Sequence, residues 1–243
     1  MVEQIDKLQV TIRRVFTTIL FLCCAPSFAE VQVGIYIPTW RSPKEIENAL
    51  KGDKALKAVK PVVFGKYKEF TTSNKGVKFP ILIVPKSHAD FSKDCKPLLQ
   101  FAAADGKNFK FVFVSLDKKW KASNVTKGKL GVVDELGRKN MKKFTQTVSG
   151  QKFGKIKRVT KVEDLVPLLA LGNVDHIMIR PDNLNHAKTN FKSTFYEIFK
   201  SNPVSHPIVC LSDQSKKSVA MSFQKMSKST LKKIGFSSIS AAE

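Results

Sequence analysis

The sequence lacks most of the motifs that mark an enzyme. It has no HExxH or CxxC motif, no Gly-x-Ser-x-Gly elbow, no Walker A motif and no Gly-x-Gly-x-x-Gly loop. Its four histidines do not have the spacing of metal ligands. Cys95 lies close to His88 and Asp90 in the sequence, but no nucleophile signature surrounds it. We therefore expect a protein that is not an enzyme and that binds no metal and no cofactor.

Long apolar runs are also missing. A membrane-spanning helix needs about 20 consecutive apolar residues, and the sequence has no run of that length. The apolar run at residues 15–25 is about half that length; basic residues precede it and Pro26 ends it. Ser27 and Ala29 then supply the small residues of a cleavage site. This pattern predicts a cleavable secretory signal peptide at residues 1–29, rather than a buried helix or a retained anchor. Phe21 and Leu22 before Cys23 favour simple cleavage over lipidation, and we expect the mature protein in the periplasm.

Acidic residues are scarce: 20 Asp and Glu oppose 42 Lys and Arg, which gives a net charge of +22. The predicted signal peptide contains three basic and two acidic residues, so the mature chain keeps about +21. Such a charge in the cytosol would indicate a nucleic-acid binder, but export and the lack of an aromatic and basic motif argue against nucleic acid. We expect attraction to anions instead. A basic charge that is merely common among envelope proteins is equally compatible with the sequence.

Cysteine is rare in the mature chain, which has only Cys95 and Cys210. In an oxidising compartment the two could form a disulfide. However, Cys210 lies in the apolar run at residues 207–211, where a buried free thiol is equally reasonable. The sequence leaves both states open, because the distance between the two residues decides the pairing.

Short β-type runs alternate with helical patterns after residue 30. Strands are predicted at residues 31–37, 61–65, 79–84, 109–115, 129–134, 155–160, 174–179, 194–199 and 206–211. Helical patterns are found at residues 42–59, 137–148, 163–171 and 214–234. Several strands are apolar at consecutive positions, as in sheets covered by helices on both faces. This alternation predicts an α/β fold with mainly parallel sheets flanked by helices.

Two polar stretches, residues 117–128 and 180–190, separate a β-α-β-α-β unit at residues 128–179 from the rest of the chain. The unit predicts a second lobe inserted into a first one. We expect the first lobe to comprise residues 30–116 and 181–243. The second lobe, with its two crossovers, would then comprise residues 117–180.

Several passages resemble the type 2 periplasmic solute-binding proteins of ABC transporters. Residues 111–134 resemble the stretch where the chain of that family enters the second lobe. Residues 161–179, with their Gly172-Asn173-Val174-Asp175 turn, resemble the family's helix, Gly-x-x-Asp turn and strand. Residues 199–236 resemble the return to the first lobe, and residues 31–46 are closest to the phosphate and phosphonate binders. The resemblance implies two lobes with a cleft for a small-molecule ligand, and an inner-membrane ABC permease as partner. We expect a monomer.

Ligands of open α/β sheets bind beyond the carboxyl ends of the strands. Applied to the predicted strands, this rule selects candidate ligand-binding residues in both lobes. They are Trp40, Arg41, Ser42, Lys86, Ser87, Ser115, Glu135, Gly137, Arg138, Arg180 and Asp182.

The residue types at these positions suit an anion. Ser42 opens a predicted helix whose first amides would form an anion cradle, and Arg41 can bind a carboxylate or phosphate through two parallel hydrogen bonds. Gly137 would let backbone amides approach the ligand, and Arg138 would close over it from the second lobe. The alternative is that Trp40 lies at the edge of the core and Arg41 is a solvated loop charge.

These features together predict an exported solute-binding protein that closes over a small, anionic, phosphate- or phosphonate-like ligand for an ABC transporter. Arg180 and Asp182 would line the cleft or belong to the hinge, and Ser115 would be a hinge contact. The alternative function is that of a basic envelope protein that binds anionic polymer or lipid surfaces without a small-molecule pocket.

Overall fold

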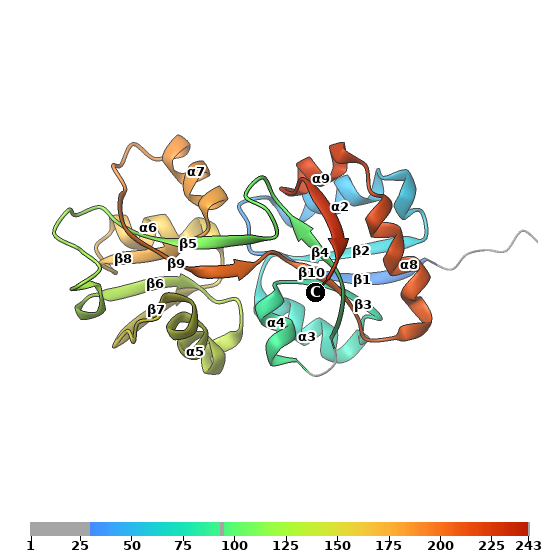
Figure 1. Ribbon diagram of the computed structural model, residues 1–243, viewed down its shortest axis with the longest axis horizontal. Helices are drawn as coiled ribbons and strands as arrows, with labels where there is room; N and C mark the ends of the chain where they lie inside the picture. The colour runs from blue at the N-terminus through green and yellow to red at the C-terminus, as the bar shows by residue number, and fades with distance from the viewer. Residues whose placement is uncertain (1–29, 93–94, 243) are drawn as a thin grey trace, which may run out of the picture. The chain divides into compact units, whose positions relative to one another are not determined.

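The computed structural model describes residues 30–92 and 95–242, so the predicted signal peptide lies outside the described residues. The described chain forms two β-sheets (Figure 1). The first sheet has the strand order β11-β4-β10-β3-β1-β2 and consists of β1 (Val31–Tyr36), β2 (Val59–Phe64), β3 (Ile81–Val84), β4 (Lys96–Ala102), β10 (Ile208–Leu211) and β11 (Ser238–Ala241). The second has the order β7-β6-β8-β5-β9 and consists of β5 (Asn108–Ser115), β6 (Lys129–Val133), β7 (Lys155–Val159), β8 (His176–Ile179) and β9 (Tyr196–Ser205).

Helices flank both sheets. Those of the first lobe are α2 (Pro43–Lys51), α3 (Tyr67–Val77), α4 (Lys86–Phe91), α8 (Lys217–Met221) and α9 (Lys228–Ile234), with the 3-10 turns η1 (Lys54–Leu56), η4 (Gln214–Lys216) and η5 (Ser222–Lys225). Those of the second lobe are α5 (Gly137–Ser149), α6 (Leu165–Ala170) and α7 (Pro181–Asn190), with η2 (Val125–Lys127) and η3 (Val162–Asp164). The predicted α/β fold with two helix-flanked sheets is confirmed. Within residues 30–92 and 95–242, no helix has the length and apolar character needed to cross a membrane.

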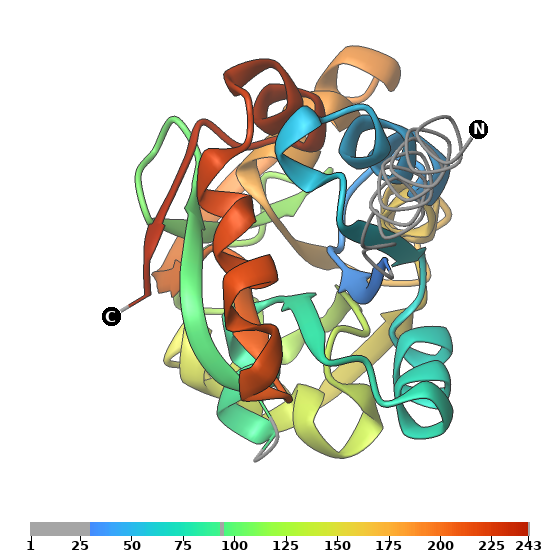
Figure 2. The same cartoon turned by 90° about the vertical axis from the view of Figure 1, so that its right-hand side faces the viewer.

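Burial on both faces explains the consecutive apolar residues of the central strands. In β3, Ile81 and Ile83 belong to the core beneath α2, α8 and α9, whereas Leu82 and Val84 belong to the core beneath α3. Figure 2 views the first lobe, with the carboxyl-terminal helices (orange to red) and α3 (teal) on different sides of the strands. The second sheet also separates two cores, one beneath α5 and one beneath α6 and α7.

Both sheets are mixed, and their parallel parts are the β-α-β units. β1 pairs with β2 and β3 in parallel, and β6 pairs with β7 and β8 in parallel. The ladders of β10 with β3 and β4, of β11 with β4, and of β5 with β8 and β9 are antiparallel. The parallel units determine where the helix amino termini lie, because each helix there starts just beyond the carboxyl end of a strand.

The two sheets divide the chain differently from the sequence prediction. The sequence predicts β5 and β9 in the first lobe, but β5 pairs with both β9 and β8 in the second sheet. The polar stretch at residues 117–128 therefore connects β5 to β6 within the second lobe. The stretch at residues 180–190 contains α7, which connects β8 to β9 within the same lobe. We propose that the lobes follow the sheets, with residues 30–102 and 208–242 in the first lobe and residues 108–205 in the second.

A disulfide joins Cys95, just before β4, to Cys210 in β10. The two residues are 115 positions apart in sequence, and their Cα atoms are 5.3 Å apart. Both side chains are buried in the core beneath α3. The pairing that the sequence left open is therefore present, and it links neighbouring strands of the first sheet.

Reduction of this disulfide should destabilise the protein by about 2–4 kcal/mol, since the crosslink restricts a long loop in the unfolded chain. Denaturant unfolding with and without dithiothreitol would measure the change. The double variant Cys95→Ala/Cys210→Ala should have a free energy of unfolding similar to that of the reduced wild type, lowered further by the packing lost with the two sulfur atoms. Its stability should not respond to dithiothreitol. An unchanged unfolding midpoint after complete reduction would contradict the prediction.

Candidate functional site

The carboxyl ends of the parallel strands from both sheets meet at one junction. In the first lobe, β1, β2 and β3 lead to the amino termini of α2, α3 and α4. In the second lobe, β6 and β8 lead to α5 and α7, and β7 leads to η3. The hydroxyl of Tyr36, at the end of β1, donates to the carbonyl oxygen of Asp134, just after β6, at 3.5 Å. This contact shows that the ends of β1 and β6 face each other.

Gly137 forms a second contact across this junction. Its φ of +75° is in the region that favours glycine. A Cβ at this position would lie 3.4 Å from the ring of Tyr67, the first residue of α3. Gly137 therefore permits both the backbone turn into α5 and a close approach of the two lobes. Sequence reasoning selected Gly137 for approach to a ligand but missed Tyr36 and Tyr67, which read as ordinary core aromatics.

Glu135 is a buried acid at this junction, with 5 % of its surface exposed. Burial raises its pKa from 4.5 to about 7. The positive charge of Arg180 lowers the pKa and the negative charges of Asp134 and Asp182 raise it, but burial is the largest effect. With this pKa, a substantial share of the Glu135 carboxyl groups is protonated near neutral pH.

Arg180 and Asp182 form an ion pair next to Glu135. The Arg180 Nε lies 3.1 Å from the Asp182 Oδ1, and its guanidinium carbon lies 4.5 Å from the centre of the Phe109 ring. Partial burial raises the pKa of Asp182, yet the nearby charges of Arg180 and Arg41 hold that pKa below its ordinary value. Arg41 belongs to the first lobe, so the electrostatic field of this cluster spans both lobes.

Trp40 lies in the loop after β1 of the first lobe but packs against the core of the second lobe. Its ring centre is 4.6 Å from that of His186 in α7 and 6.2 Å from that of Phe191. Its indole nitrogen is buried and has no hydrogen-bond partner among the described residues. Trp40 is therefore a contact between the lobes.

Arg41 and Ser42 have different surroundings although they are neighbours. Ser42 caps α2: its hydroxyl accepts from the amide of Glu45 at 3.2 Å, and its own amide donates to the Glu45 carboxylate at 2.8 Å. The capping box therefore engages the Ser42 hydroxyl and the Glu45 amide, which the sequence predicts to bind an anion. Arg41 donates to the hydroxyl of Thr39 at 3.4 Å and lies beside Gly235.

The residues after β3 lie at the start of α4. Lys86 is 3.7 Å from the Asp90 carboxylate, and Ser87 is buried. His88, which follows the same strand, is also buried, and burial lowers its pKa. Its Nδ1 lies 3.4 Å from the Tyr67 hydroxyl, so α4 is connected to the aromatic contacts of the junction.

The prediction that Ser115 is a hinge contact is wrong. β5 runs antiparallel to β8, so the carboxyl end of β5 lies at the edge of the sheet opposite the junction. There the Ser115 hydroxyl donates to the carbonyl oxygen of Asp175 at 2.7 Å and accepts from the amide of Asp117 at 3.1 Å. The chain passes between the sheets at residues 103–107 and 206–207 instead.

Arg138 does not extend towards the first lobe. It lines a cavity of about 240 Å³ within the second lobe, between α5 and β7, together with Lys142 and Arg158. The side chain of Arg158 also lies 3.2 Å from the Asp134 carboxylate. Arg138 is therefore not part of the lining of the junction cavity.

A cavity of about 220 Å³ is lined by both lobes at the junction. Its polar lining comprises Thr39, Arg41, Lys66 and Glu69 from the first lobe and Lys161 and Glu163 from the second. Lys66 pairs with Glu69 at 3.0 Å, and Lys161 lies 4.0 Å from Glu163. Within the described ranges, Arg41 has no carboxylate at ion-pair distance. Its charge is thus available to a solute of a few atoms.

Comparison of the sequence with known proteins finds no match, whereas comparison of the structure with solved structures does. No protein-family model matches the sequence. No curated protein sequence matches it either. Solved structures do match. A binding protein component of an ABC phosphonate transporter from Pseudomonas aeruginosa is 14 % identical with a TM-score of 0.65, and the match covers 88 % of this chain and 82 % of that one.

Two more solved structures have the same architecture. PhnD1 of Prochlorococcus marinus, in complex with methylphosphonate, is 13 % identical with a TM-score of 0.63, covering 89 % of this chain and 94 % of that one. The fold is that of the periplasmic substrate-binding proteins. An amino acid ABC transporter substrate-binding protein of Streptococcus pneumoniae bound to L-arginine is 13 % identical with a TM-score of 0.52, covering 82 % and 87 %. At these identities the likeness concerns the fold and leaves the ligand open.

The raised pKa of Glu135 predicts a loss of stability as pH rises from about 4.5 to 7, because over this range the unfolded chain releases the proton that the folded protein still holds on the buried carboxyl. Glu135→Gln removes this cost. The variant should gain about 3 kcal/mol in free energy of unfolding at about pH 8 and nothing at about pH 4. Denaturant titrations across this pH range would measure the difference, and Glu163→Gln controls for the loss of one surface charge. A difference that does not vary with pH would contradict the prediction.

Proposed function

We propose that this chain is an exported solute-binding protein that captures a small anionic solute in the junction cavity and delivers it to an ABC permease of the inner membrane. The observation that supports this most directly is Arg41, a cation without a carboxylate partner among the described residues, in a cavity lined by both lobes. The net charge of +22 would draw anions towards the protein. Two of the structural neighbours named above belong to phosphonate transport or bind methylphosphonate.

Export is also part of the proposal. The predicted signal peptide supports it, and so does the buried disulfide between Cys95 and Cys210, because disulfides persist in oxidising compartments. The proposed role is binding alone, without a reaction. Separation of the two sheets about the crossings at residues 103–107 and 206–207 would open the cavity, and closure would present both lobes to the permease.

Ligand binding can be tested through thermal stability. The protein would be titrated with phosphate, methylphosphonate, sulfate and amino acids at constant ionic strength. A cognate anion at about 100 times its Kd should add about 2.7 kcal/mol to the free energy of unfolding. Arg41→Ala should abolish this effect, whereas Lys44→Ala, which removes a nearby exposed cation outside the cavity, should retain it. No response to any anion, or an equal response in Arg41→Ala, would overturn the proposal.

The charge of the second lobe favours a second candidate function, binding to anionic envelope polymer or lipid. Between Glu135 and Glu163 the sequence has nine basic residues and no acidic residue. Binding by such a surface weakens steeply with salt, whereas a ligand buried in the cavity is screened far less. Sedimentation with anionic vesicles over a range of salt concentrations would separate this function from capture of a solute.

A further inference from the structure

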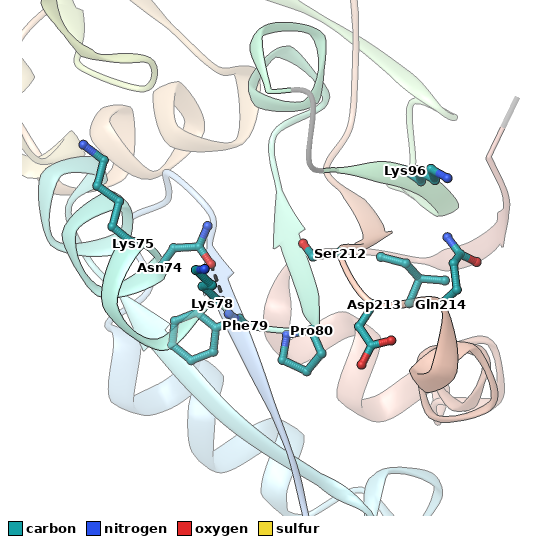
Figure 3. A pocket seen from close by; sticks show the side chains of 10 residues that line it. Asn74, Lys75, Lys78, Phe79, Pro80, Lys96, Ser212, Asp213 and Gln214 are labelled. Atoms are coloured by element: carbon teal, nitrogen blue, oxygen red, sulfur yellow. Dashed lines mark hydrogen bonds between the residues drawn. The ribbon is translucent and has the colours of Figure 1, made fainter.

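A large groove lies at the opposite end of the first sheet from the junction cavity (Figure 3). It has a volume of about 760 Å³ and is lined by the end of α3, the start of β3, the start of β4 and the turn after β10. In the antiparallel pair of β3 and β10, Leu211 lies opposite Ile81, whereas Ile208 lies opposite Val84. The groove is thus at the amino end of β3 and the junction is at its carboxyl end. The two cavities share no lining residue.

The walls of the groove are held in place by the backbone and the disulfide. Lys96 and Leu211 line the groove and pair with each other in the sheet, directly beside the disulfide-bonded Cys95 and Cys210. The amides of Ser212 and Asp213 both donate to the carbonyl oxygen of Pro80, at 3.0 and 3.2 Å.

The opposite wall is held by Asn74, whose side-chain oxygen accepts from the amide of Phe79 at 3.2 Å. A ligand would therefore meet walls that are already positioned on both sides, which lowers the entropic cost of binding.

Positive charge dominates the lining. Lys75, Lys78 and Lys96 line the groove, and none has an ion-pair partner in the part of the chain that the structure describes. The acidic lining residue is Asp213, and its two carboxylate oxygens accept from the amide and the hydroxyl of Ser215, both at 2.9 Å. Three unpaired cations against one engaged carboxylate give the groove an affinity for anions.

Lys78 adds a backbone observation. It caps α3 with a φ of 52° and a ψ of 65°, and within residues 30–92 and 95–242 it is the one non-glycine residue with a positive φ. A glycine would hold this left-handed cap with less strain, and the difference is about 1 kcal/mol. Backbone strain of this kind is common at functional sites, and here it would be offset if the ammonium group of Lys78 binds a ligand.

We propose that this groove is a second binding site, which takes an elongated anion with two or more phosphate or carboxylate groups. Figure 3 shows Lys75 and Lys96 on opposite sides of Pro80, with both ammonium groups directed away from it, and Lys78 beside Asn74 on the Lys75 side. Lysine ammonium groups on long flexible stems can fold inwards over separated charges. The side-chain amides of Asn74 and Gln214 provide further polar contacts. A single phosphate would fill only a small part of this volume, so the multivalent anion is the better match.

The test uses tripolyphosphate and citrate as probes, with monophosphate for comparison, in isothermal titration calorimetry at constant ionic strength. In the Arg41→Ala variant, whose junction cavity should no longer bind phosphate, the groove should bind the two multivalent probes at least about tenfold more tightly than monophosphate. Lys78→Gly removes the charge and the backbone strain together. It should weaken binding of tripolyphosphate by about tenfold while the unfolding temperature stays the same or rises.

Three further variants make the outcome decisive. Lys78→Asn keeps a residue that tolerates the left-handed cap and should also weaken binding. Asp213→Asn removes the acidic charge and should strengthen binding, whereas Lys225→Ala removes an exposed cation elsewhere and should change nothing.

Arg41→Ala in the junction separates this site from the proposed solute site, since it should leave tripolyphosphate binding unchanged. Equal losses in Lys78→Gly and Lys225→Ala would show attraction by net charge alone and overturn the proposal. Absence of binding by both multivalent probes would also overturn it.

Discussion

The two places where the chain passes between the sheets are hydrogen-bonded to each other, and the rest of the architecture depends on this pairing. The amide of His206 donates to the carbonyl oxygen of Lys107 at 3.0 Å, and the ring of His206 lies 3.0 Å from the Asp105 carboxylate. The long ladder of β5 and β9 continues from this point, with Asn108 opposite Ser205. The second lobe is therefore a closed insertion that begins and ends at one place. Because these crossings lie outside the strands of both sheets, the proposed opening of the junction cavity would leave both sheets intact.

The fold class follows from the sequence because buried parallel strands and their helices have a strong local pattern. The lobe boundaries do not, because β5 and β9 look the same whichever sheet they join, and only long-range pairing decides. The same limit explains why the sequence wrongly predicts Ser115 as a hinge contact. Ligands bind beyond the carboxyl ends of parallel strands, and the sequence does not show that β5 is antiparallel. Arg41, Glu135, Arg180 and Asp182 did come together, because each follows a strand of a parallel unit.

Apart from Arg41, the charges discussed at the junction have opposite charges nearby, although the protein as a whole is strongly basic. Arg180 pairs with Asp182 and lies close enough to Glu135 to lower its pKa, and Lys66 and Lys161 each have a glutamate nearby. The excess positive charge lies elsewhere, including the second lobe between Glu135 and Glu163. In the proposed function, the net charge would act over long range on approaching anions, while a few side chains would determine what fits in the cavity.

The packing of Trp40 affects the energetics of opening. Its indole covers apolar surface of the other lobe, so separation of the lobes exposes both the ring and its neighbours to water. If the lobes separate as proposed, this contact would favour the closed form before any solute binds. In a protein that binds between its lobes, the apparent Kd is the intrinsic Kd divided by the fraction of molecules already in the competent form. Under the proposed function, Trp40 would therefore tune affinity through the conformational equilibrium, without having to contact the solute.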